Sequence, residues 1–174
     1  MSSHRVTDLS MLAMNGVHRA LLAVSGGRLG WKIGPMAVVE LHTIGRTSGV
    51  RRSTMLTAPI NQPDRVVLIA SKGGDERNPF WYSNLVAHPD VELTERGITR
   101  PMRARTADAA EKTALWPEIV RAYPGYASYQ RRTDRDIPVV ICEARPPEPP
   151  RDAAQDSAAQ EPAAQDPTAQ EPTG

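Results

Sequence analysis

The residues best suited to chemistry in this 174-residue chain begin with a basic turn, Arg46-Thr47-Ser48-Gly49-Val50-Arg51-Arg52. A tight turn between two strands would bring the guanidinium groups of Arg46 and Arg52, hydroxyl groups and free backbone N–H groups onto one small surface. Such a surface suits an anion, because arginine forms paired hydrogen bonds with phosphate or carboxylate and the N–H groups add positive potential. On this motif alone, a basic hairpin tip without a ligand is the simpler interpretation.

A second group of reactive side chains follows in Ser71-Lys72-Gly73-Gly74. It places a hydroxyl, an amine and flexible backbone after an apolar stretch that is expected to be a buried strand, and ligands commonly meet a sheet at such strand ends. The alternative is a loop that needs glycine for positive φ angles.

Aromatic side chains form two further clusters in a chain that is only 5% aromatic. Trp81 and Tyr82 lie next to Asn84, and Tyr123, Tyr126 and Tyr129 occur in Tyr-Pro-Gly-Tyr-Ala-Ser-Tyr. Phenols spaced three apart around a Pro-Gly break do not resemble a core stripe, because a buried phenol needs a hydrogen-bond partner. The spacing therefore predicts a pocket wall.

An antiparallel sheet is expected to position these groups. The hydrophobic pattern predicts strands over 37–44, 51–60, 65–71, 91–96, 98–107 and 138–143. Because these strands follow one another in hairpins, they favour an antiparallel sheet, and six strands of this length can close into a small barrel. Helices are expected over 80–87 and from Asp108, where Asp108 and Glu111 resemble a capping box and Pro117 would bend or restart the helix.

The chain is expected to have one folded domain with two flanking segments. Residues 1–34 contain an amphipathic pattern over 8–25 and a linker, residues 35–145 form the barrel, and residues 146–174 contain AAQDS, AAQEP, AAQDP and TAQEP in tandem. The tail is expected to be disordered, since it has no apolar residue larger than alanine to offset its ordering entropy. The N-terminal helix is expected to cover the core, with contact to a membrane or a ligand tail as alternatives.

Composition excludes several other classes of protein. The formal net charge is +1, but residues 146–174 carry six acidic residues and one basic residue, which leaves residues 1–145 at +6. This modest excess suits an anionic ligand better than nucleic acid, for which no stacking motif is present. With Cys142 as the single cysteine and four scattered histidines, neither an intramolecular disulfide nor a metal site is expected. The absence of a signal-peptide pattern or a long apolar run predicts a cytoplasmic protein, with peripheral membrane contact as an option.

Taken in order, these motifs resemble the deazaflavin-dependent nitroreductase family, a group of split-β-barrel proteins that bind coenzyme F420. The resemblance runs from about Val38 to Ala144. Its marks are Gly45-Arg46-x-Ser48-Gly49-x-x-Arg52, Ala70-Ser71-Lys72-Gly73-Gly74, Asn78-Pro79-x-Trp81-Tyr82-x-Asn84-Leu85, and a last block from Trp116-Pro117 through the three tyrosines to Thr133-Asp134-Arg135-x-Ile137-Pro138. The expected fold is thus a mainly β, α+β split barrel of about six antiparallel strands with packed helices.

The resemblance also implies a set of site residues. Those that would line the coenzyme are Arg46, Thr47, Ser48, Arg52, Ser53, Thr54, Met55, Leu56, Thr57, Ile69, Ala70, Ser71, Lys72, Phe80, Trp81, Tyr82, Ser83, Asn84 and Tyr126. Those placed beside the reacting groups as catalytic residues are Ser71, Tyr123, Tyr126 and Tyr129. The arginine turn and Lys72 would face the phosphate and glutamate carboxylates of F420. Thr47 stands where a lysine is common, and Thr57 stands where the best-known activity of the family has a tyrosine.

The expected function is that of an oxidoreductase. It would transfer a hydride from reduced F420 to a quinone-like or nitro-bearing small molecule, with no covalent nucleophile and no metal. The alternative is a non-catalytic protein that holds F420 or a lipid-like ligand on the same barrel. The hydroxyl of Ser71 and the tyrosines favour the enzyme, whereas Thr57 favours the carrier.

Overall fold

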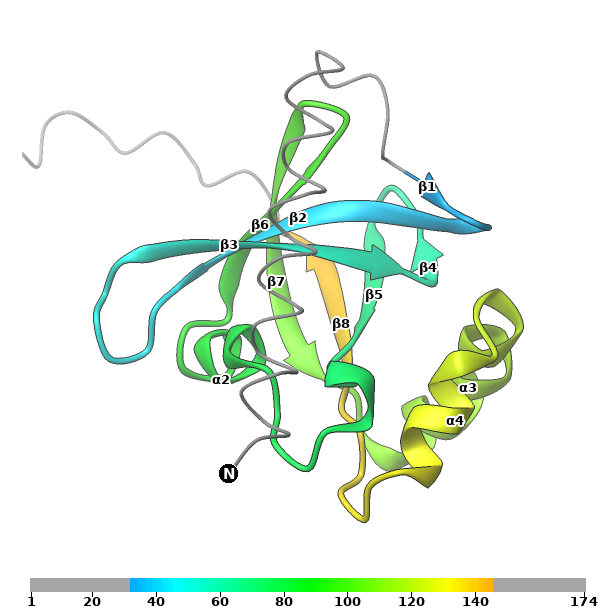
Figure 1. The fold of residues 1–174 in the computed structure, drawn as a ribbon. Coiled ribbons are helices and arrows are strands. Elements are labelled where there is room, and N and C mark those ends of the chain that lie inside the picture. The colour runs from blue at the N-terminus through cyan, green and yellow to red at the C-terminus, as the bar shows by residue number, and fades with distance from the viewer. Residues whose placement is uncertain (1–31, 146–174) are drawn as a thin grey trace, which may run out of the picture.

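The computed structural model describes residues 32–145, and within them an antiparallel sheet of eight strands forms the fold. The strands are β1 (Lys32–Ile33), β2 (Met36–Ile44), β3 (Arg51–Ala58), β4 (Ile60–Asn61), β5 (Arg65–Ile69), β6 (Asp90–Glu95), β7 (Ile98–Thr106) and β8 (Val139–Ala144). They are ordered β1-β2-β6-β7-β8-β5-β4, and β3 pairs with β2. Figure 1 shows the sheet curling round into an open barrel. The helix expected over 8–25 and the repeat tail lie outside the described residues.

The six expected strands correspond to the six longer strands, with small changes at their ends. The expected strand over 51–60 is interrupted at Pro59, because proline has no N–H group to donate to a neighbouring strand. The expected strand over 65–71 ends at Ile69, since a 3₁₀ turn, η1 (Lys72–Gly74), begins soon after it. Gly97 and Arg96 both have positive φ in the turn that joins β6 to β7, as a two-residue hairpin turn requires.

Both faces of β5 are covered, which explains its uninterrupted apolar sequence. Val66 and Leu68 belong to the core inside the curled sheet, together with Leu85 of α2. Val67 and Ile69 point the opposite way and pack with Ile119, Tyr126 and other residues of a second cluster. Alternate residues of one strand thus hold two hydrophobic layers together.

Three helices cover the sheet in the described part of the chain: α2 (Phe80–Ala87), α3 (Ala109–Ala122) and α4 (Gly125–Arg131). The capping box predicted for α3 is confirmed, because Glu111 N–H donates to Asp108 Oδ1 at 2.8 Å and Asp108 N–H donates to Glu111 Oε2 at 3.0 Å. The helix continues through Pro117 instead of restarting there. Helix α4 is additional to the predicted elements. It begins at the Pro124-Gly125 step that the sequence indicated only as a break.

The helices divide into two groups around the sheet. Helices α3 and α4 contact each other and lie at one side of the sheet, where α4 also contacts η1, whereas α2 packs against β2 and β7 (Figure 1). The end of β5, the turn η1 and the tyrosine-bearing helix α4 therefore meet in one place. Among residues 32–145 no helix has the length and apolar character needed to cross a membrane.

We predict that Ile119→Ala destabilises the fold by about 2–5 kcal/mol, as is usual for truncation of a large buried aliphatic side chain. Ile119 has no exposed surface and is the one fully buried side chain with which α3 joins the second cluster. The free energy of unfolding can be measured with urea. The control is Glu118→Ala, an exposed neighbour on the same helix, expected to change stability by no more than about 0.5 kcal/mol. Equal effects of the two substitutions would contradict the packing described here.

Candidate active site

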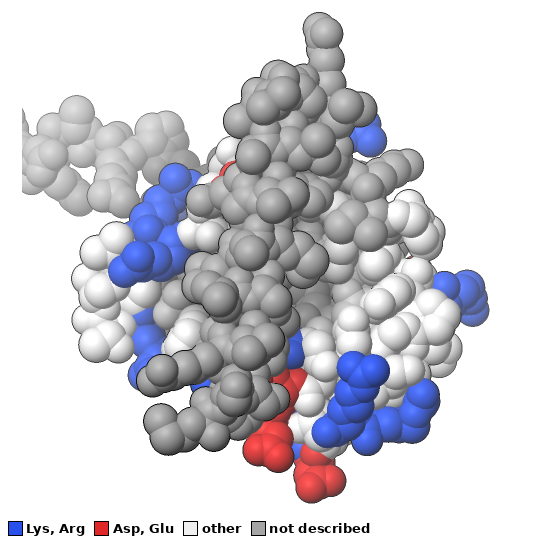
Figure 2. Space-filling model, in the orientation of Figure 1, with Lys and Arg blue, Asp and Glu red and all other residues white. Residues whose placement is uncertain are grey.

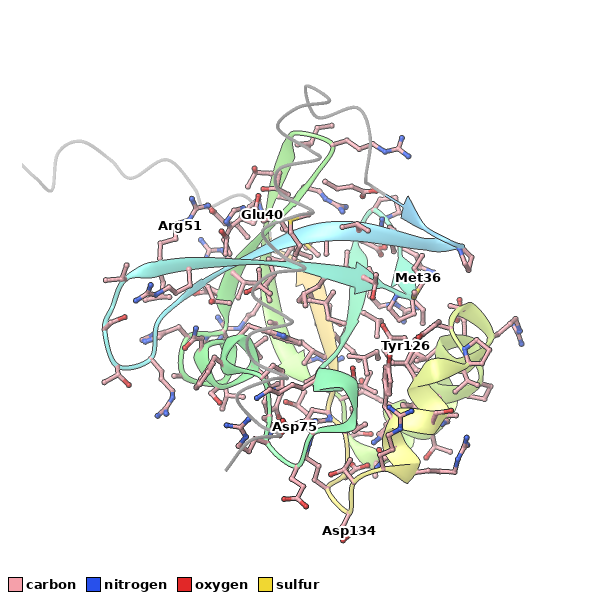
Figure 3. The ribbon with its side chains drawn as sticks, viewed as in Figure 1. Met36, Glu40, Arg51, Asp75, Tyr126 and Asp134 are labelled. Atoms are coloured by element: carbon pink, nitrogen blue, oxygen red, sulfur yellow. The ribbon has the colours of Figure 1, made fainter. Side chains whose placement is uncertain are left out.

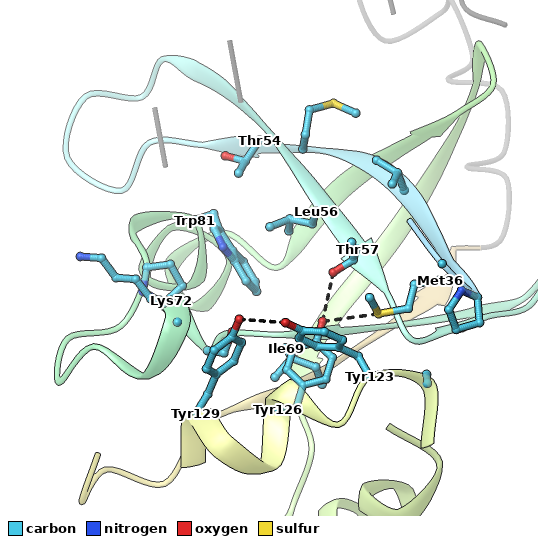
Figure 4. A pocket seen from close by; sticks show the side chains of 18 residues that line it. Met36, Thr54, Leu56, Thr57, Ile69, Lys72, Trp81, Tyr123, Tyr126 and Tyr129 are labelled. Carbon is cyan, nitrogen blue, oxygen red and sulfur yellow. Dashed lines mark hydrogen bonds between the residues drawn. The ribbon is translucent and has the colours of Figure 1, made fainter. Parts of the chain in front are cut away.

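A cavity of about 580 Å³ opens where β2, β3, η1, α2, α3 and α4 meet. Its size lies within the range of small-molecule sites, about 300–1,000 Å³. The residues that line it are Gly34, Pro35, Met36, Val38, Thr54, Met55, Leu56, Thr57, Ile69, Ser71, Lys72, Gly73, Pro79, Trp81, Ala122, Tyr123, Tyr126 and Tyr129. Figure 4 shows Trp81 and Leu56 on one side of the cavity and the tyrosines on the other. The cavity is thus largely apolar, with hydroxyl groups contributed by β3, by Ser71 and by the tyrosines.

The three tyrosines, which the sequence predicted to form a pocket wall, all line the cavity and make one aromatic cluster. Their ring centroids are 5.3 Å apart for Tyr123 and Tyr126, 6.1 Å for Tyr123 and Tyr129, and 6.2 Å for Tyr126 and Tyr129. Gly125 allows this arrangement, since a Cβ atom there would come within 2.2 Å of the Tyr123 ring. The Pro-Gly step therefore lets Tyr123 fold back over the start of α4 and face the cavity.

The phenol groups have different partners. Tyr126 OH lies 3.0 Å from Thr57 Oγ1 and points toward Met36 Sδ at 4.0 Å (Figures 3 and 4). Tyr123 OH and Tyr129 OH lie 3.3 Å apart and form a separate pair (Figure 4). Strand β3 thus orients Tyr126, while the other two phenols orient each other.

The surroundings raise the pKa of two of these phenols, Tyr126 and Tyr129. Burial raises the pKa of Tyr126, although its hydrogen bond with Thr57 acts in the opposite direction. The hydrogen bond with Tyr123, together with burial, raises the pKa of Tyr129 to about 12, while the positive charge of Arg132 opposes this increase. The Arg132 guanidinium lies over the Tyr129 ring, 5.7 Å from its centroid. Tyr126 and Tyr129 are therefore neutral phenols at physiological pH.

The turn after β5 supplies a hydroxyl and an ammonium group. Ser71 is 9% exposed, and its side chain does not cap the turn that follows. The side chain of Lys72 is 5% exposed, and its Nζ lies 3.8 Å from Asp75 Oδ2. Lys72, Gly73 and Gly74 all have positive φ, at 47°, 67° and 85°. The alternative given for this segment, a loop that needs glycine for positive φ, is thus seen at Gly73 and Gly74, and Lys72 takes a third left-handed position.

Lys72 and Arg77 surround the buried carboxylate of Asp75 and lower its pKa. Burial alone would raise the pKa of Asp75, but hydrogen bonds from the side chain and backbone of Arg77 and the charge of Lys72 hold it below its usual range. Arg77 Nε lies 3.2 Å from Asp75 Oδ1. The ionised carboxylate of Asp75 thus lies beside the buried side chain of Lys72.

The arginine turn lies outside the cavity but is connected to it through β3. Basic side chains lie over the β2–β3 hairpin, on the side where Arg51 is labelled (Figures 2 and 3). Arg52 shares a face of β3 with Thr54 and Leu56, since alternate residues of a strand point the same way. It lies two residues before Thr54, about 7 Å along the strand. Neither Arg46 nor Arg52 forms an ion pair with another residue of the range 32–145, and both are exposed.

Several predicted coenzyme residues do not line the cavity: Arg46, Thr47, Ser48, Arg52, Ser53, Ala70, Phe80, Tyr82, Ser83 and Asn84. Asn84 instead supports the hairpin, because it accepts from Arg46 N–H at 3.1 Å and donates to Thr43 Oγ1 at 3.2 Å. Tyr82 OH lies 2.9 Å from Thr106 Oγ1, and Ala70 is fully buried in the inner core. The contacts of this group with the coenzyme stay predictions.

Other cavity residues were missed by the sequence prediction: Gly34, Pro35, Met36, Val38, Gly73, Pro79 and Ala122. The strand register could have indicated Val38, because it pairs with Thr57, which was predicted. Met36 lies two residues earlier and so shares the face of Val38. Nothing in the sequence marked Ala122, which is brought to the cavity by the end of α3.

Comparisons with known proteins show which proteins this chain is similar to. A family model described as F420H(2)-dependent quinone reductase matches residues 16–144. An F420H(2)-dependent quinone reductase of Mycobacterium tuberculosis strain H37Rv is 39% identical over 137 residues, which cover 74% of this chain and 89% of that protein. The solved structure of an F420-H2-dependent reductase, FDR-A, is 38% identical with a TM-score of 0.56, and the match covers 61% of this chain and 93% of that chain.

A further solved structure, of a domain-swapped dimer, is 33% identical with a TM-score of 0.59 and covers 76% of this chain and 97% of its own. The expected split-barrel fold is confirmed by this likeness to F420-dependent reductases together with the curled antiparallel sheet. The family model spans well over half of the residues, and the sequence identity extends over most of the barrel. The chain therefore belongs to the F420H(2)-dependent quinone reductase family.

Proposed function

We propose that this chain binds coenzyme F420 in the cavity and reduces a quinone there. The observation that carries the proposal is that one cavity unites β3 residues 54–57, the Ser71–Lys72 turn and the three tyrosines. When bound, reduced F420 supplies a hydride, which is the redox chemistry that the side chains themselves lack. The test is to titrate the protein with F420 and then to follow oxidation of the reduced coenzyme with a series of quinones. Binding of F420 with no turnover of any quinone would indicate a carrier.

The lining of the cavity fits a planar deazaflavin ring with an anionic side arm. Apolar side chains such as Leu56, Ile69 and Trp81 suit the faces of an aromatic ring, and the hydroxyl groups suit its polar edge. Arg52 and Arg46 would hold the phosphate and carboxylates of the side arm, because they are exposed and unpaired within residues 32–145 and Arg52 lies next to the cavity along β3. Lys72 would add positive charge at the cavity wall.

Side chains would control the hydrogen bonds and the proton. Quinone reduction to a quinol consumes one hydride and one proton, so the site needs a proton source as well as the coenzyme. The Ser71 hydroxyl would donate a hydrogen bond to an oxygen that gains negative charge, and the Tyr123 and Tyr129 pair would supply the proton or relay it from water. Tyr126, already bonded to Thr57, would fix the shape of the acceptor site.

A nitro-bearing compound is a second class of acceptor that we propose, because it too accepts a hydride at an electron-poor group. A cytoplasmic location and peripheral membrane contact through the N-terminal segment also belong to the proposal. That segment lies outside the described residues. Cosedimentation of the full chain with anionic lipid vesicles would test the contact, and a protein that stays entirely in the supernatant would contradict it.

We predict that Ser71→Ala lowers the turnover rate about 10²–10³-fold, the usual effect of removing one donor to a developing oxyanion. The Kd for F420 should change much less, since the hydroxyl acts mainly on charge that develops during the reaction. Stopped-flow oxidation of reduced F420 and equilibrium titration measure the two quantities. The control is Ser128→Ala on α4, whose hydroxyl bonds Arg131 and should leave both quantities unchanged. An unaltered rate in Ser71→Ala would remove Ser71 from the mechanism.

Replacing Arg46 or Arg52 by alanine is predicted to weaken the binding of intact F420 about tenfold to a hundredfold. A charged hydrogen bond contributes about 1.5–3 kcal/mol, which corresponds to this change in Kd. A truncated deazaflavin with the ring and ribityl chain but no phosphate or glutamate should bind equally to all variants. Arg103→Ala, which removes an exposed arginine elsewhere on the sheet, is the control. Equal weakening of both compounds would mean that the arginines support the hairpin and do not bind the side arm.

The Tyr123→Phe substitution is predicted to lower the pKa of Tyr129 from about 12 toward 10. The hydrogen bond with Tyr123 is the largest cause of the raised pKa, and burial would leave it somewhat above 10. Because the pKa is raised in the folded state, its contribution to stability is complete below about pH 10 and is lost as pH rises toward 12. NMR of ring-labelled tyrosine can follow the titration. A Tyr129 pKa that does not change would show that the two phenols are not paired in solution.

A further inference from the structure

Arg135 is a half-buried residue between α4 and β8, and it has no part in the proposed mechanism. Its guanidinium donates hydrogen bonds to acceptors that all belong to residues 70–78. These are Ala70 O and Ser71 O from Nη2, both at 2.9 Å, Asp75 O from Nε at 2.8 Å, and Asn78 Oδ1 from Nη1 at 2.8 Å. One side chain thus bonds along the whole segment between the end of β5 and the start of α2. This segment carries Ser71 and Lys72.

The acceptors of Arg135 lie on both sides of the left-handed turn. Ser71 O immediately precedes the three positive-φ residues 72–74, and Asp75 O immediately follows them. Positive φ is uncommon for a lysine, and such a conformation persists only where surrounding contacts hold it. The turn's own hydrogen bonds are two, from Gly74 N–H to Ser71 O at 2.9 Å and from Asp75 N–H to Lys72 O at 3.2 Å. The guanidinium therefore bonds the carbonyl groups at both ends of the turn, from a residue that is not part of the turn.

The same turn packs directly against the tyrosine-bearing helix. A Cβ atom at Gly74 would lie 2.9 Å from Tyr129 O and 3.0 Å from Arg132 Cβ. Arg135 follows α4 by four residues, so it belongs to the chain segment that carries the tyrosines while its hydrogen bonds go to the segment that carries Ser71. Loss of these bonds would free the Ser71 side of the cavity to move relative to the tyrosine side.

Arginine is the one side chain suited to bonding acceptors on both sides of this turn. Its planar guanidinium presents five N–H donors in a fixed fork, whereas lysine presents one ammonium group at the end of a flexible stem. The acceptors lie in different directions around the guanidinium. A lysine could keep the positive charge but could not bond the carbonyl groups on both sides of the turn together with Asn78.

We propose that Arg135 is a positioning residue of the coenzyme site, which holds the left-handed turn 72–74 in the shape that places Ser71 and Lys72 in the cavity. This inference rests on the proposed function of the same cavity. Arg135 acts through the turn and does not line the cavity. Its contribution should therefore depend on the geometry of its fork and not on its charge.

The test compares Arg135→Lys with Arg105→Lys. Arg105 also uses its guanidinium in a bidentate contact, with Glu111, but it ties β7 to α3 away from the cavity. Both variants should lose a few degrees in Tm. Arg135→Lys should weaken F420 binding at least tenfold and lower kcat, while Arg105→Lys should keep both within twofold of the wild type. In coenzyme-free Arg135→Lys, the amides of Gly74 and Asp75 should exchange with solvent at least tenfold faster.

An Arg135→Lys protein with unchanged F420 affinity and unchanged amide exchange at Gly74 and Asp75 would overturn the proposal. If this variant does not fold, Asn78→Ala tests the proposal instead, because it removes one of the four hydrogen bonds and leaves the guanidinium in place. It should weaken F420 binding and speed the exchange of the same two amides severalfold, and the absence of both effects would also overturn the proposal. Failure of the wild-type protein to bind F420 would instead contradict the proposed function. The exchange of the two amides would still test whether Arg135 keeps the turn in its shape.

Discussion

The pairing of β5 with β8 is the constraint on which the rest of the structure depends. The register runs from Arg65 opposite Glu143 to Ile69 opposite Val139, and Ala70 N–H continues it by donating to Pro138 O at 3.0 Å. Because α3 and α4 lie between β7 and β8 in the sequence, inserting β8 between β7 and β5 brings both helices against the end of β5. The sheet register thus sets the distance between the Ser71 turn and the tyrosines, which are more than 50 residues apart in the chain.

The fold could be predicted from the sequence wherever short-range patterns decide it. Alternating and continuous apolar runs located the six longer strands, and Asp108 and Glu111 located the start of α3. Helix α4 was missed because its seven residues include only two large ring-bearing side chains, Tyr126 and Tyr129, which are too few to give a helical hydrophobic pattern. The interruption at Pro59 follows from the missing N–H group, but a sequence pattern alone could not distinguish it from the end of a longer strand.

The site was predictable in its chemistry but not in its boundary. Ser71, Lys72, Trp81 and the tyrosines stand out by residue type, and the cavity brings them together. Met36 and Ala122 are ordinary apolar residues, and only the fold brings the start of β2 and the end of α3 to the same cavity. Arg135 shows the same limit, because a single arginine in a loop does not reveal that its partners lie about 60 residues earlier in the chain.

The hydroxyl at Thr57 determines how the phenol groups of the cavity divide their roles. Tyr126 is 5% exposed and already has Thr57 Oγ1 at 3.0 Å, so its hydroxyl is engaged by the protein and its position is fixed. Tyr123 is 38% exposed, and its hydroxyl bonds that of Tyr129. The pair therefore includes an exposed phenol that water can reach, whereas the hydroxyl of Tyr126 is enclosed by Thr57 and Met36. The same threonine is smaller than the tyrosine that the nitroreductase resemblance associates with this position, and it therefore leaves more of the cavity open.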